Sequence, residues 1–575
     1  MLEMNLESIR KQEFKNVENT GKSIAMRIRG IEISSNYRII SAAYGAYLAK
    51  INKIMDGKEL LNYIGGNLKE STQYFLRDQT NDIFWESVIE ISKEYTVETL
   101  LAVVLWYPTT EGRHNIDRDT PLGIIKLVNM ILDPQNEQVA DFCCGSGNFL
   151  SYVAEKNENV SLYGIEIDTQ QKEISNIRIS LLSDNALVEQ GTVFSVPAEK
   201  KYAKIFCDYP WGIRLRDKFS DVEHVGEIDS LIPEVERLTT FDWMFIANVI
   251  AHLSDDGKAV VITTNGITLN GGLSKNIRER LVKRGLIEAV IALPGNLYQT
   301  TGISTSILVL SKNNTKVRFV DATDMATKGR RQNELNDKSI KKIAKMMLEE
   351  TSCSILVDFK KLEENDFVFN PSRYLQTEIK VEDGVPFESV IKSITRGAQV
   401  KASELDKLVS EEPTDYQYLM LANIQDGMIN EDLPYIKELD KKLEKYCIKN
   451  NNLIISKNGI PVKVAVASVE DGKKILGNGN LYIVELDTEQ VDPYFVKAYL
   501  ESENGMVALS RILVGTMLPN IPVDGLKRLQ IPVPSKLEQK RIVDKYVAKM
   551  DEIRVLKYKL QKATAELKTI FEEGR

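Results

Sequence analysis

The segment Asp141–Leu150, DFCCGSGNFL, constrains the fold of this chain more than any other stretch. It follows an apolar strand pattern and precedes a helical pattern, so it is predicted to form a strand-to-helix turn. Gly145 and Gly147 lack a Cβ atom, which lets the backbone adopt positive φ values and approach a ligand closely. The arrangement is typical of a nucleotide-type cofactor site. Because Leu150 occupies the place of the third glycine in a dinucleotide fingerprint, NAD is disfavoured.

A second motif, CDYPWG at residues 207–212, follows another short apolar run. Together the two motifs resemble the S-adenosylmethionine loop and the catalytic tetrapeptide of the DNA methyltransferases that methylate an exocyclic amino group. The resemblance implies that the Asp208 carboxylate and the Tyr209 carbonyl accept the two amino protons and stabilise the developing positive charge. Pro210 belongs to the same tetrapeptide, and Trp211 is expected to stack on a flipped adenine.

The same resemblance assigns the cofactor contacts. The glycine loop is expected to wrap the methionine end of S-adenosylmethionine, and Asp141 to hold its ammonium group. Glu166, at the end of the next strand pattern, lies where an acid accepts both ribose hydroxyls. Many relatives carry an aspartate for the adenine amino group where this chain has Thr192, so backbone groups and an apolar wall at Phe194 are expected instead. The predicted cofactor residues are Thr120, Pro121, Asp141, Gly145, Ser146, Gly147, Phe149, Glu166 and Phe194.

Further motifs, all in the same order, make the resemblance specific. Residues 141–374 resemble the modification subunit of type I restriction-modification systems, an N6-adenine DNA methyltransferase whose cofactor loop precedes its catalytic loop. Residues 385–575 resemble half of a specificity subunit, which carries the target-recognition domains of such systems. The supporting motifs are Thr120-Pro121, Asp242 with Trp243 and Phe245, LPGNLYQTTGISTSILVLSK (293–312), NPSRY (370–374), YLMLANIQDGMI (418–429), NNLIISKNG (451–459) and LPNIP (518–522).

Hydrophobic periodicity and turn signals divide the 575 residues into four predicted regions. The predicted fold class is α/β, and the resemblance implies a Rossmann-like S-adenosylmethionine-dependent methyltransferase sheet and an α+β target-recognition domain. Residues 376–384 are polar and are interpreted as a linker. The regions are an N-terminal helical domain (1–112), the methyltransferase domain (113–375), the target-recognition domain (376–534) and a long coiled-coil-like helix (535–575).

Short apolar runs that alternate with helical stretches predict the strands of the sheet. Only residues 312–315 separate the last two runs, which is too short for a crossover helix, so the sheet is predicted to end in an antiparallel hairpin. After the first strand, which begins at Val139, the runs lie at 161–167, 204–208, 258–264, 287–293, 305–311 and 317–321.

The composition of the chain leads to predictions about its cellular location and about metal binding, but not about its activity. The chain has no run of about 18 apolar residues, and its polar N-terminus is unlike a secretory signal, so a cytoplasmic protein without a membrane segment is predicted. Its five cysteines show no metal-ligand spacing, and no metal site is predicted. The net charge of −8 does not exclude a nucleic-acid partner, because basic stretches such as Lys275–Arg284 occur locally.

These observations predict a sequence-specific DNA methyltransferase that acts on adenine N6 in double-stranded DNA and belongs to, or derives from, a restriction-modification system. The alternative is a DNA-binding or assembly protein with a degenerate catalytic core, since Tyr209 replaces the first proline of the family tetrapeptide. Methylation of a protein glutamine is disfavoured, because that chemistry has no use for a recognition domain. The chain shows no Walker loop and no nuclease carboxylate cluster, so restriction would need a separate subunit.

The last helix also predicts how the protein assembles. A complete specificity subunit carries two recognition domains separated by two antiparallel helices, whereas this chain supplies one domain and one helix. A homodimer through the C-terminal helix is therefore predicted, and packing of the helix on its own chain is the alternative. The apolar stripe of this helix consists of Tyr546, Met550, Ile553, Leu560 and Leu567.

Overall fold

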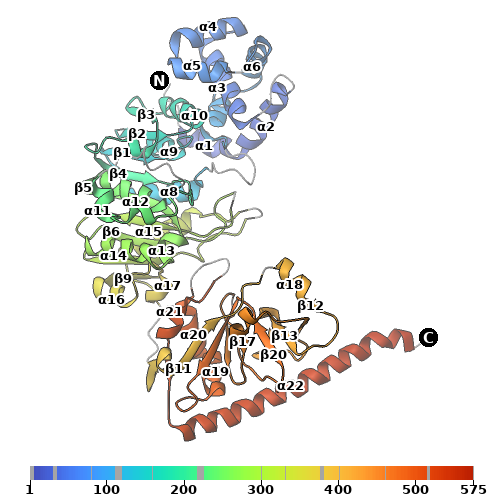
Figure 1. Ribbon diagram of the computed structural model, residues 1–575. Coiled ribbons are helices and arrows are strands. Elements are labelled where there is room, and N and C mark those ends of the chain that lie inside the picture. The colour runs from blue at the N-terminus through green and yellow to red at the C-terminus, as the bar shows by residue number, and fades with distance from the viewer. Residues whose placement is uncertain are drawn as a thin grey trace. The chain divides into compact units, whose positions relative to one another are not determined.

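The chain folds into two compact units, Met1–Leu375 (unit 1) and Gln376–Arg575 (unit 2) (Figure 1). Residues 376–380 of the predicted linker, and the motif positions Thr300 and Leu518, lie outside the part that is described. The computed structural model describes residues 6–29, 35–78, 80–109, 119–157, 159–215, 226–299, 301–329, 332–375, 381–400, 402–459, 461–513 and 519–573.

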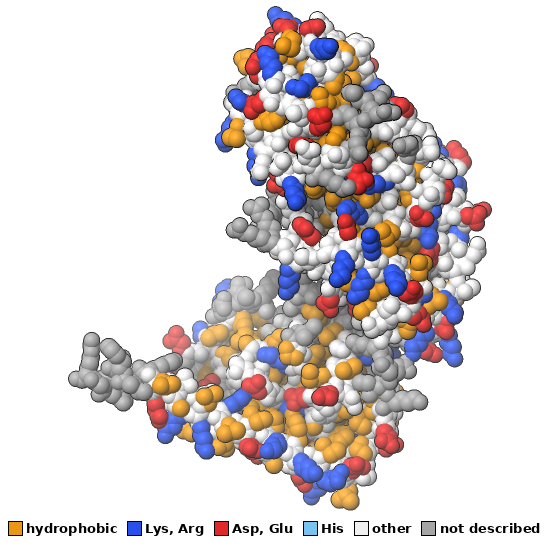
Figure 2. Space-filling model, turned by 180° about the vertical axis from the view of Figure 1, so that it is seen from behind, with side chains coloured by type: hydrophobic (Ala, Val, Ile, Leu, Met, Phe, Trp, Pro, Cys, Tyr) orange, Lys and Arg blue, Asp and Glu red, His pale blue; other side chains and the backbone are white. Residues whose placement is uncertain are grey.

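Charges of both signs are mixed on the surface. Figure 2 shows basic and acidic side chains interspersed over the visible face of unit 1, together with scattered hydrophobic side chains. The net charge of −8 is therefore not gathered into one acidic region on that face. Within the described ranges, no helix has the length and hydropathy needed to cross a lipid bilayer.

Unit 1 begins with the helices predicted for the N-terminal region. Helix α3 packs on α6 and α7, and every residue from Ile39 to Ala49 is buried. The bundle core also includes Ile174 and Ile177 of α10 (Thr169–Ser180), so the bundle packs on a helix of the α/β fold that follows it. The helices of the bundle are α1 (Leu6–Glu13), η1 (Phe14–Asn16), α2 (Val17–Ile28), α3 (Asn36–Asn52), α4 (Gly57–Asn67), α5 (Glu70–Arg77), α6 (Asp82–Glu94) and α7 (Val97–Trp106).

The described strands of unit 1 form one sheet in the order β3-β2-β1-β4-β5-β7-β6-β8-β9. The first five strands in this order are parallel, β7 and β9 are antiparallel to their neighbours, and β6 pairs with β8 in parallel. The predicted Rossmann-like α/β fold is confirmed. The strands are β1 (Gln138–Phe142), β2 (Ser161–Glu166), β3 (Ala186–Gln190), β4 (Tyr202–Cys207), β5 (Leu253–Thr264), β6 (Ile287–Ala292), β7 (Thr305–Leu310), β8 (Lys316–Asp321) and β9 (Ser354–Asp358).

The predicted hairpin between the last two apolar runs is wrong. Strand β7 lies inside the sheet, where β5 and β6 pair with its two edges, and β8 lies on the far side of β6. All six residues of β7 are buried, which fits a strand with both edges paired better than an edge strand with a row of open backbone groups. The short connection therefore passes across the end of β6, and two strands adjacent in sequence are not neighbours in the sheet.

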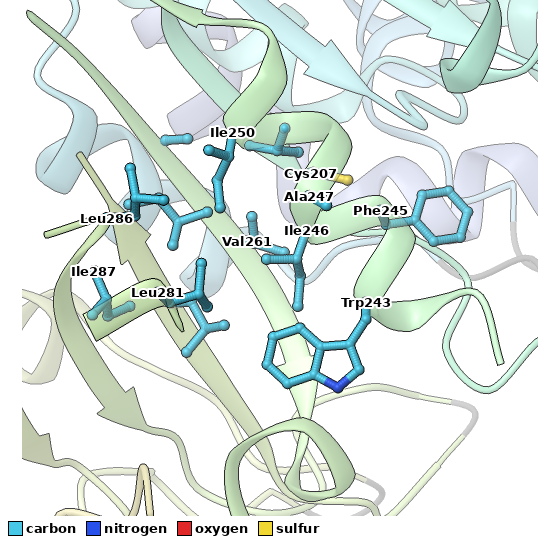
Figure 3. Packing of buried hydrophobic residues seen from close by; sticks show 14 of the residues in the cluster. Cys207, Trp243, Phe245, Ile246, Ala247, Ile250, Val261, Leu281, Leu286 and Ile287 are labelled. Carbon is cyan, nitrogen blue, oxygen red and sulfur yellow. The ribbon is translucent and has the colours of Figure 1, made fainter. Parts of the chain in front are cut away.

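Helices cover both faces of the sheet. The neighbours Val139 and Ala140 of β1 enter different hydrophobic clusters, because successive strand side chains point to opposite faces. Figure 3 shows Ile246 of α12 beside Val261 of β5, whereas Phe245 projects from another side of α12. The remaining helices of unit 1 are α8 (Leu122–Leu132), α9 (Asn148–Lys156), η2 (Val193–Ser195), α11 (Gly226–Leu231), η4 (Val235–Arg237), α12 (Asp242–Ala251), α13 (Asn265–Leu269), α14 (Leu273–Lys283), α15 (Asp337–Leu348), α16 (Phe359–Glu364) and α17 (Ser372–Leu375).

Unit 2 contains small sheets and five α-helices within its described residues. Its main sheets have the orders β11-β21-β18-β19 and β12-β16-β13-β20-β17, and β10-β22 and β14-β15 form two-stranded pairs. The elements are β10 (Gly384–Pro386), η5 (Phe387–Val390), β11 (Ile391–Arg396), α18 (Ala402–Leu408), β12 (Val409–Ser410), β13 (Tyr416–Leu419), η6 (Leu421–Asn423), β14 (Ile424–Gln425), β15 (Met428–Ile429), β16 (Tyr435–Ile436), η7 (Lys441–Tyr446), β17 (Cys447–Ile448), β18 (Leu453–Ser456), β19 (Val464–Val466), β20 (Lys474–Gly477), β21 (Leu481–Leu486), α19 (Pro493–Glu501), α20 (Glu503–Ile512), α21 (Val523–Arg528), β22 (Gln530–Pro532) and α22 (Lys536–Glu573).

The first part of α22 is attached to its own unit. The Gln539 side chain is buried; it donates hydrogen bonds to the carbonyls of Gln490 and Pro534 and accepts one from the Asp492 N–H. About two turns further along the helix, the Tyr546 hydroxyl bonds with side chains of α19. The later part of the helix extends beyond the strands of this unit (Figure 1).

The Tyr546 contacts anchor α22 at a second point. Its hydroxyl lies between the ammonium group of Lys497 and the carboxylate of Glu501, which also bond to each other at 2.9 Å. Burial lowers the pKa of Lys497, and the Glu501 carboxylate beside it opposes that shift. Packing of α22 on its own chain, the alternative to a partner helix, therefore holds for the start of the helix, including Tyr546 of the predicted stripe. Further along, the ammonium group of Lys557 also bonds with the Asp426 carboxylate of the same unit.

Candidate cofactor and catalytic site

A cavity of about 300 Å³ opens at the carboxyl ends of β1, β2 and β4. This edge of a parallel sheet is where open α/β folds bind their ligands. The predicted residues Pro121, Gly147, Phe194, Tyr209 and Trp211 are not among those that line it. The predicted residues that do line it are Thr120, Asp141, Gly145, Ser146, Phe149, Glu166, Asp208 and Pro210.

The charged groups that line the cavity are all acidic within the described part of the chain. They are the carboxylates of Asp119, Asp141, Glu166, Asp168 and Asp208, with no lysine, arginine or histidine among them. Such a lining attracts a cation and repels the phosphates of a dinucleotide. S-adenosylmethionine carries a sulfonium and an ammonium group against a single carboxylate, and no phosphate, so its net charge is positive and the acidic lining fits this cofactor.

Asp141 is the most deeply buried of these acids. Its side chain is 2% exposed, and its Oδ1 atom has no hydrogen-bond donor among the described residues. Burial, with Asp208 and Glu166 nearby, raises the pKa of Asp141 well above its ordinary value. A buried carboxylate oxygen without a donor costs free energy. An ammonium group in the cavity would supply that donor, which is the role predicted for this residue.

Glu166 is held by the backbone on both sides. Its Oε2 accepts a hydrogen bond from the Gly145 N–H at 2.9 Å, and its Oε1 accepts one from the Asp168 N–H at 2.9 Å. Each carboxylate oxygen retains a lone pair for a further donor. The carboxylate is thus oriented at the end of β2 with capacity for two ligand hydroxyls, as its predicted ribose role requires.

Gly145 and Gly147 have different structural roles in the cofactor loop. Gly145 has φ +53°, and a Cβ built on it would meet no atom within 4 Å, so its missing side chain leaves cavity space open. Gly147 has φ +77°, and a Cβ there would lie 2.4 Å from the Ser175 hydroxyl of α10. Gly147 was predicted as a cofactor contact, but it does not line the cavity, and its missing side chain allows α10 to pack closely against the loop.

The Asp208 carboxylate is positioned by two hydroxyl groups. Thr120 Oγ1 and the Tyr298 hydroxyl each donate to Asp208 Oδ2 at 2.8 Å. Tyr298 is 1% exposed and had no role assigned from the sequence, although it lies within the quoted motif at 293–312. Thr120 was predicted as a cofactor contact, and it also bonds to the predicted catalytic carboxylate.

Tyr209 points away from the cavity. Its ring is fully buried and stacks on Phe245 at 4.8 Å, and its hydroxyl bonds with Thr263 Oγ1 at 2.7 Å. Burial raises the pKa of this phenol well above its ordinary value. Tyr209 therefore adds no bulk to the cavity where the family has a proline, because its side chain occupies the core behind the loop.

Trp211 is anchored at the other end of the tetrapeptide. Its indole N–H donates to the Ile262 carbonyl at 3.2 Å, and its ring meets Tyr298 edge to face at 5.0 Å. The residue is half-buried and does not line the cavity. Stacking on a base stays a prediction.

The apolar wall assigned to Phe194 comes from other residues. Phe194 is 6% exposed and packs on Phe245 at 5.1 Å, whereas Phe245 itself lines the cavity. Val193 and Ile167 complete this wall. Phe194 therefore supports the wall from behind. Phe245 belongs to a quoted motif, but nothing in that motif indicated which side of its helix faces the cavity.

Glu166 makes the cavity sensitive to pH. Burial raises the pKa of this carboxylate above its ordinary value of 4.5. A cationic ligand binds best when Glu166 is ionised, so affinity for S-adenosylmethionine is expected to fall as pH decreases through the raised pKa. Calorimetry between about pH 8 and about pH 5 should show that the affinity for the cofactor falls at a higher pH than the one at which an ordinary glutamate titrates. Glu166→Gln should bind weakly with a flatter pH profile; an unchanged profile in this variant would assign the titration to another acid.

Comparisons with known proteins agree with this fold and site. Residues 107–383 match the family model N-6 DNA Methylase, and residues 398–562 match the Type I restriction modification DNA specificity domain. A type I restriction enzyme methylase subunit of Mycoplasma pneumoniae is 25% identical over 308 residues, which are 49% of this chain and 57% of that protein. One from Methanocaldococcus jannaschii is 23% identical over 367 residues, 57% of this chain and 63% of that protein.

A solved structure shows the same fold. The type I restriction-modification methyltransferase subunit of Streptococcus thermophilus superposes with a TM-score of 0.53 at 17% identity, covering 64% of this chain and all of that one. The described sheet therefore has the Rossmann-like fold of that subunit, and the cavity lies at its ligand-binding edge. The chain combines an N-6 DNA methylase domain with a type I restriction-modification DNA specificity domain, and its matched segments span about three fifths of the curated relatives.

Proposed function

We propose that this protein is a sequence-specific DNA methyltransferase that transfers a methyl group from S-adenosylmethionine to adenine N6 and carries its own target-recognition domain. The observation that carries the proposal is the Asp208 carboxylate, fixed by two hydroxyls at the edge of an acidic cavity. The matches to an N-6 DNA methylase model and to a DNA specificity domain support the substrate class.

The four residues of the catalytic tetrapeptide have different roles. When bound, S-adenosylmethionine supplies an electrophilic methyl group. Asp208 accepts one proton of the target amino group in a hydrogen bond, and the Tyr209 carbonyl accepts the other, so positive charge on the attacking nitrogen is stabilised. Pro210 restricts the backbone between them and Trp211. Because the target adenine must leave the DNA stack to reach this loop, base flipping is part of the proposal.

The site favours this function over a degenerate core. Tyr209 replaces a family proline, but its ring is accommodated in the hydrophobic core and leaves the cavity open. DNA from cells that express only this chain should contain N6-methyladenine at one recurring sequence, detected by modification-sensitive long-read sequencing. Purified protein that binds DNA and S-adenosylmethionine but leaves every adenine unmodified would favour the DNA-binding alternative. Cleavage of DNA, where it accompanies modification, is assigned to a separate subunit.

We propose further that two chains pair through α22. Beyond the attached start of the helix, Ile553, Leu556, Leu560 and Leu567 are 41% to 68% exposed and follow heptad spacing. A second copy of the same helix, packed antiparallel, would cover this stripe on both chains. Two-fold symmetry then predicts an interrupted inverted repeat as the DNA site, methylated on both strands.

Two variants test the pairing. One introduces a charge on the apolar stripe of α22, and the other introduces the same charge at a position outside the stripe. Leu560→Glu places a carboxylate on the stripe, whereas Val555→Glu places it at another position of the helix that is 54% exposed. Light scattering should give a dimer for the parent protein and for Val555→Glu, and a monomer for Leu560→Glu. A parent protein that is monomeric at micromolar concentration and methylates one strand of an asymmetric site would rule out the pairing.

A further inference from the structure

Arg178 of α10 connects the N-terminal bundle to the cofactor loop. Its guanidinium is fully buried and donates to the carbonyls of Val104 and Tyr107, at the end of α7, at 2.9 and 2.5 Å. Its Nη1 atom donates to Ser146 Oγ at 2.9 Å and to Asn148 Oδ1 at 2.8 Å. One rigid, planar group therefore binds the last turn of a bundle helix and two side chains of the loop.

Asp119 completes the connection from the opposite side. Its carboxylate accepts hydrogen bonds from Ser146 Oγ at 3.1 Å and Asn148 Nδ2 at 2.8 Å, and from the backbone N–H and hydroxyl of Thr109 at 2.8 and 2.9 Å. Ser146 and Asn148 thus each accept from Arg178 and donate to Asp119. The loop is braced between a cation and an anion that are both bonded to the chain just after α7.

We propose that Arg178 is a positioning residue that, together with the cavity acid Asp119, couples the cofactor loop to the end of α7, so that the N-terminal bundle helps to set cofactor affinity. The last carbonyls of α7 lack partners within the helix, and Arg178 bonds to one of them, that of Val104, and to the carbonyl of the C-cap residue Tyr107. A buried network of this kind is rigid when complete and costly when one member is lost. A change at the end of α7 therefore changes the geometry of Ser146, which lines the cavity.

Coupling of this kind is reciprocal. If the bundle affects cofactor binding, then the bound cofactor must stabilise the end of α7 by the same free energy. The amide hydrogens in the last turn of α7 should therefore exchange more slowly with S-adenosylmethionine present. This readout does not depend on methyl transfer. The inference rests on the proposed function only for the identity of the cofactor.

The test compares two buried arginines. Arg278 is also fully buried, and its hydrogen bonds within the described chain go to the backbone carbonyls of Phe367, Ile267 and Asn270, away from the cavity. Burial lowers the pKa of both guanidinium groups to about 10. Arg178→Met should raise the dissociation constant of S-adenosylmethionine about 3- to 30-fold and abolish the cofactor-dependent protection of α7. Arg278→Met should lower the melting temperature without changing either readout.

If Arg178→Met or Arg278→Met does not fold, a milder substitution at Thr109 still tests the coupling. Thr109→Val removes the hydroxyl bonds to Asp119 Oδ1 and Gln171 Oε1 from a residue outside the cavity, and a rise of about 2- to 5-fold in the dissociation constant is expected. Equal cofactor affinity and equal protection in parent and variant would overturn the coupling while leaving the proposed function intact. A parent protein that shows the coupling but modifies no DNA would overturn the proposed function and leave the coupling intact.

Discussion

Asp208→Ala is expected to lower the rate of methyl transfer strongly while the protein still folds and binds DNA. The substitution removes the carboxylate that accepts an amino proton, and loss of one such charge-stabilising group typically lowers kcat by about 10²- to 10³-fold. Single-turnover transfer of a labelled methyl group to DNA measures the effect directly. Full activity in this variant would refute the catalytic role.

The groups that hold Asp208 provide graded controls. Thr120→Val and Tyr298→Phe each remove one hydroxyl donor at 2.8 Å but keep the carboxylate. Each is expected to reduce the rate by about 2- to 13-fold, the equivalent of one hydrogen bond of about 0.5 to 1.5 kcal/mol. A loss as large as that of Asp208→Ala in either variant would show that the hydroxyl does more than orient the carboxylate.

Gly145→Val is expected to abolish binding of S-adenosylmethionine without unfolding the protein. The new side chain would extend into open cavity space, since no atom lies within 4 Å of the Cβ position. Isothermal titration calorimetry should detect no binding at cofactor concentrations that saturate the parent protein. Retained affinity would refute the assignment of the glycine loop.

Backbone strain at this position needs a matched control. Gly145 has φ +53°, and a valine there costs about 1 to 3 kcal/mol whatever the space around it. Gly272 has φ +60°, also has open space at its Cβ position and does not line the cavity. Gly272→Val should therefore lose stability and keep cofactor binding, which separates strain from obstruction of the cavity.

The local patterns of the chain determined the fold class and the position of the cavity. Strand and helix periodicity is a property of short segments, so the strands around the cofactor loop could be predicted from residues close together in sequence. The acids Asp141, Glu166 and Asp208 were found because each ends or follows a strand, and the ends of parallel strands meet at one edge of the sheet. The region after residue 376 was recognised from motifs rather than periodicity, since its strands are short.

Only the tertiary structure decided which side chains meet. Asp208 is 88 residues from Thr120 and 90 from Tyr298, and no local pattern predicts contacts over such separations. The same holds for the place of β7 between β5 and β6, which depends on pairing with a strand earlier in the chain. Local sequence could identify Gly145 and Gly147 as a flexible pair. It could not show that one faces open cavity and the other faces α10, because that difference depends on packing between distant segments.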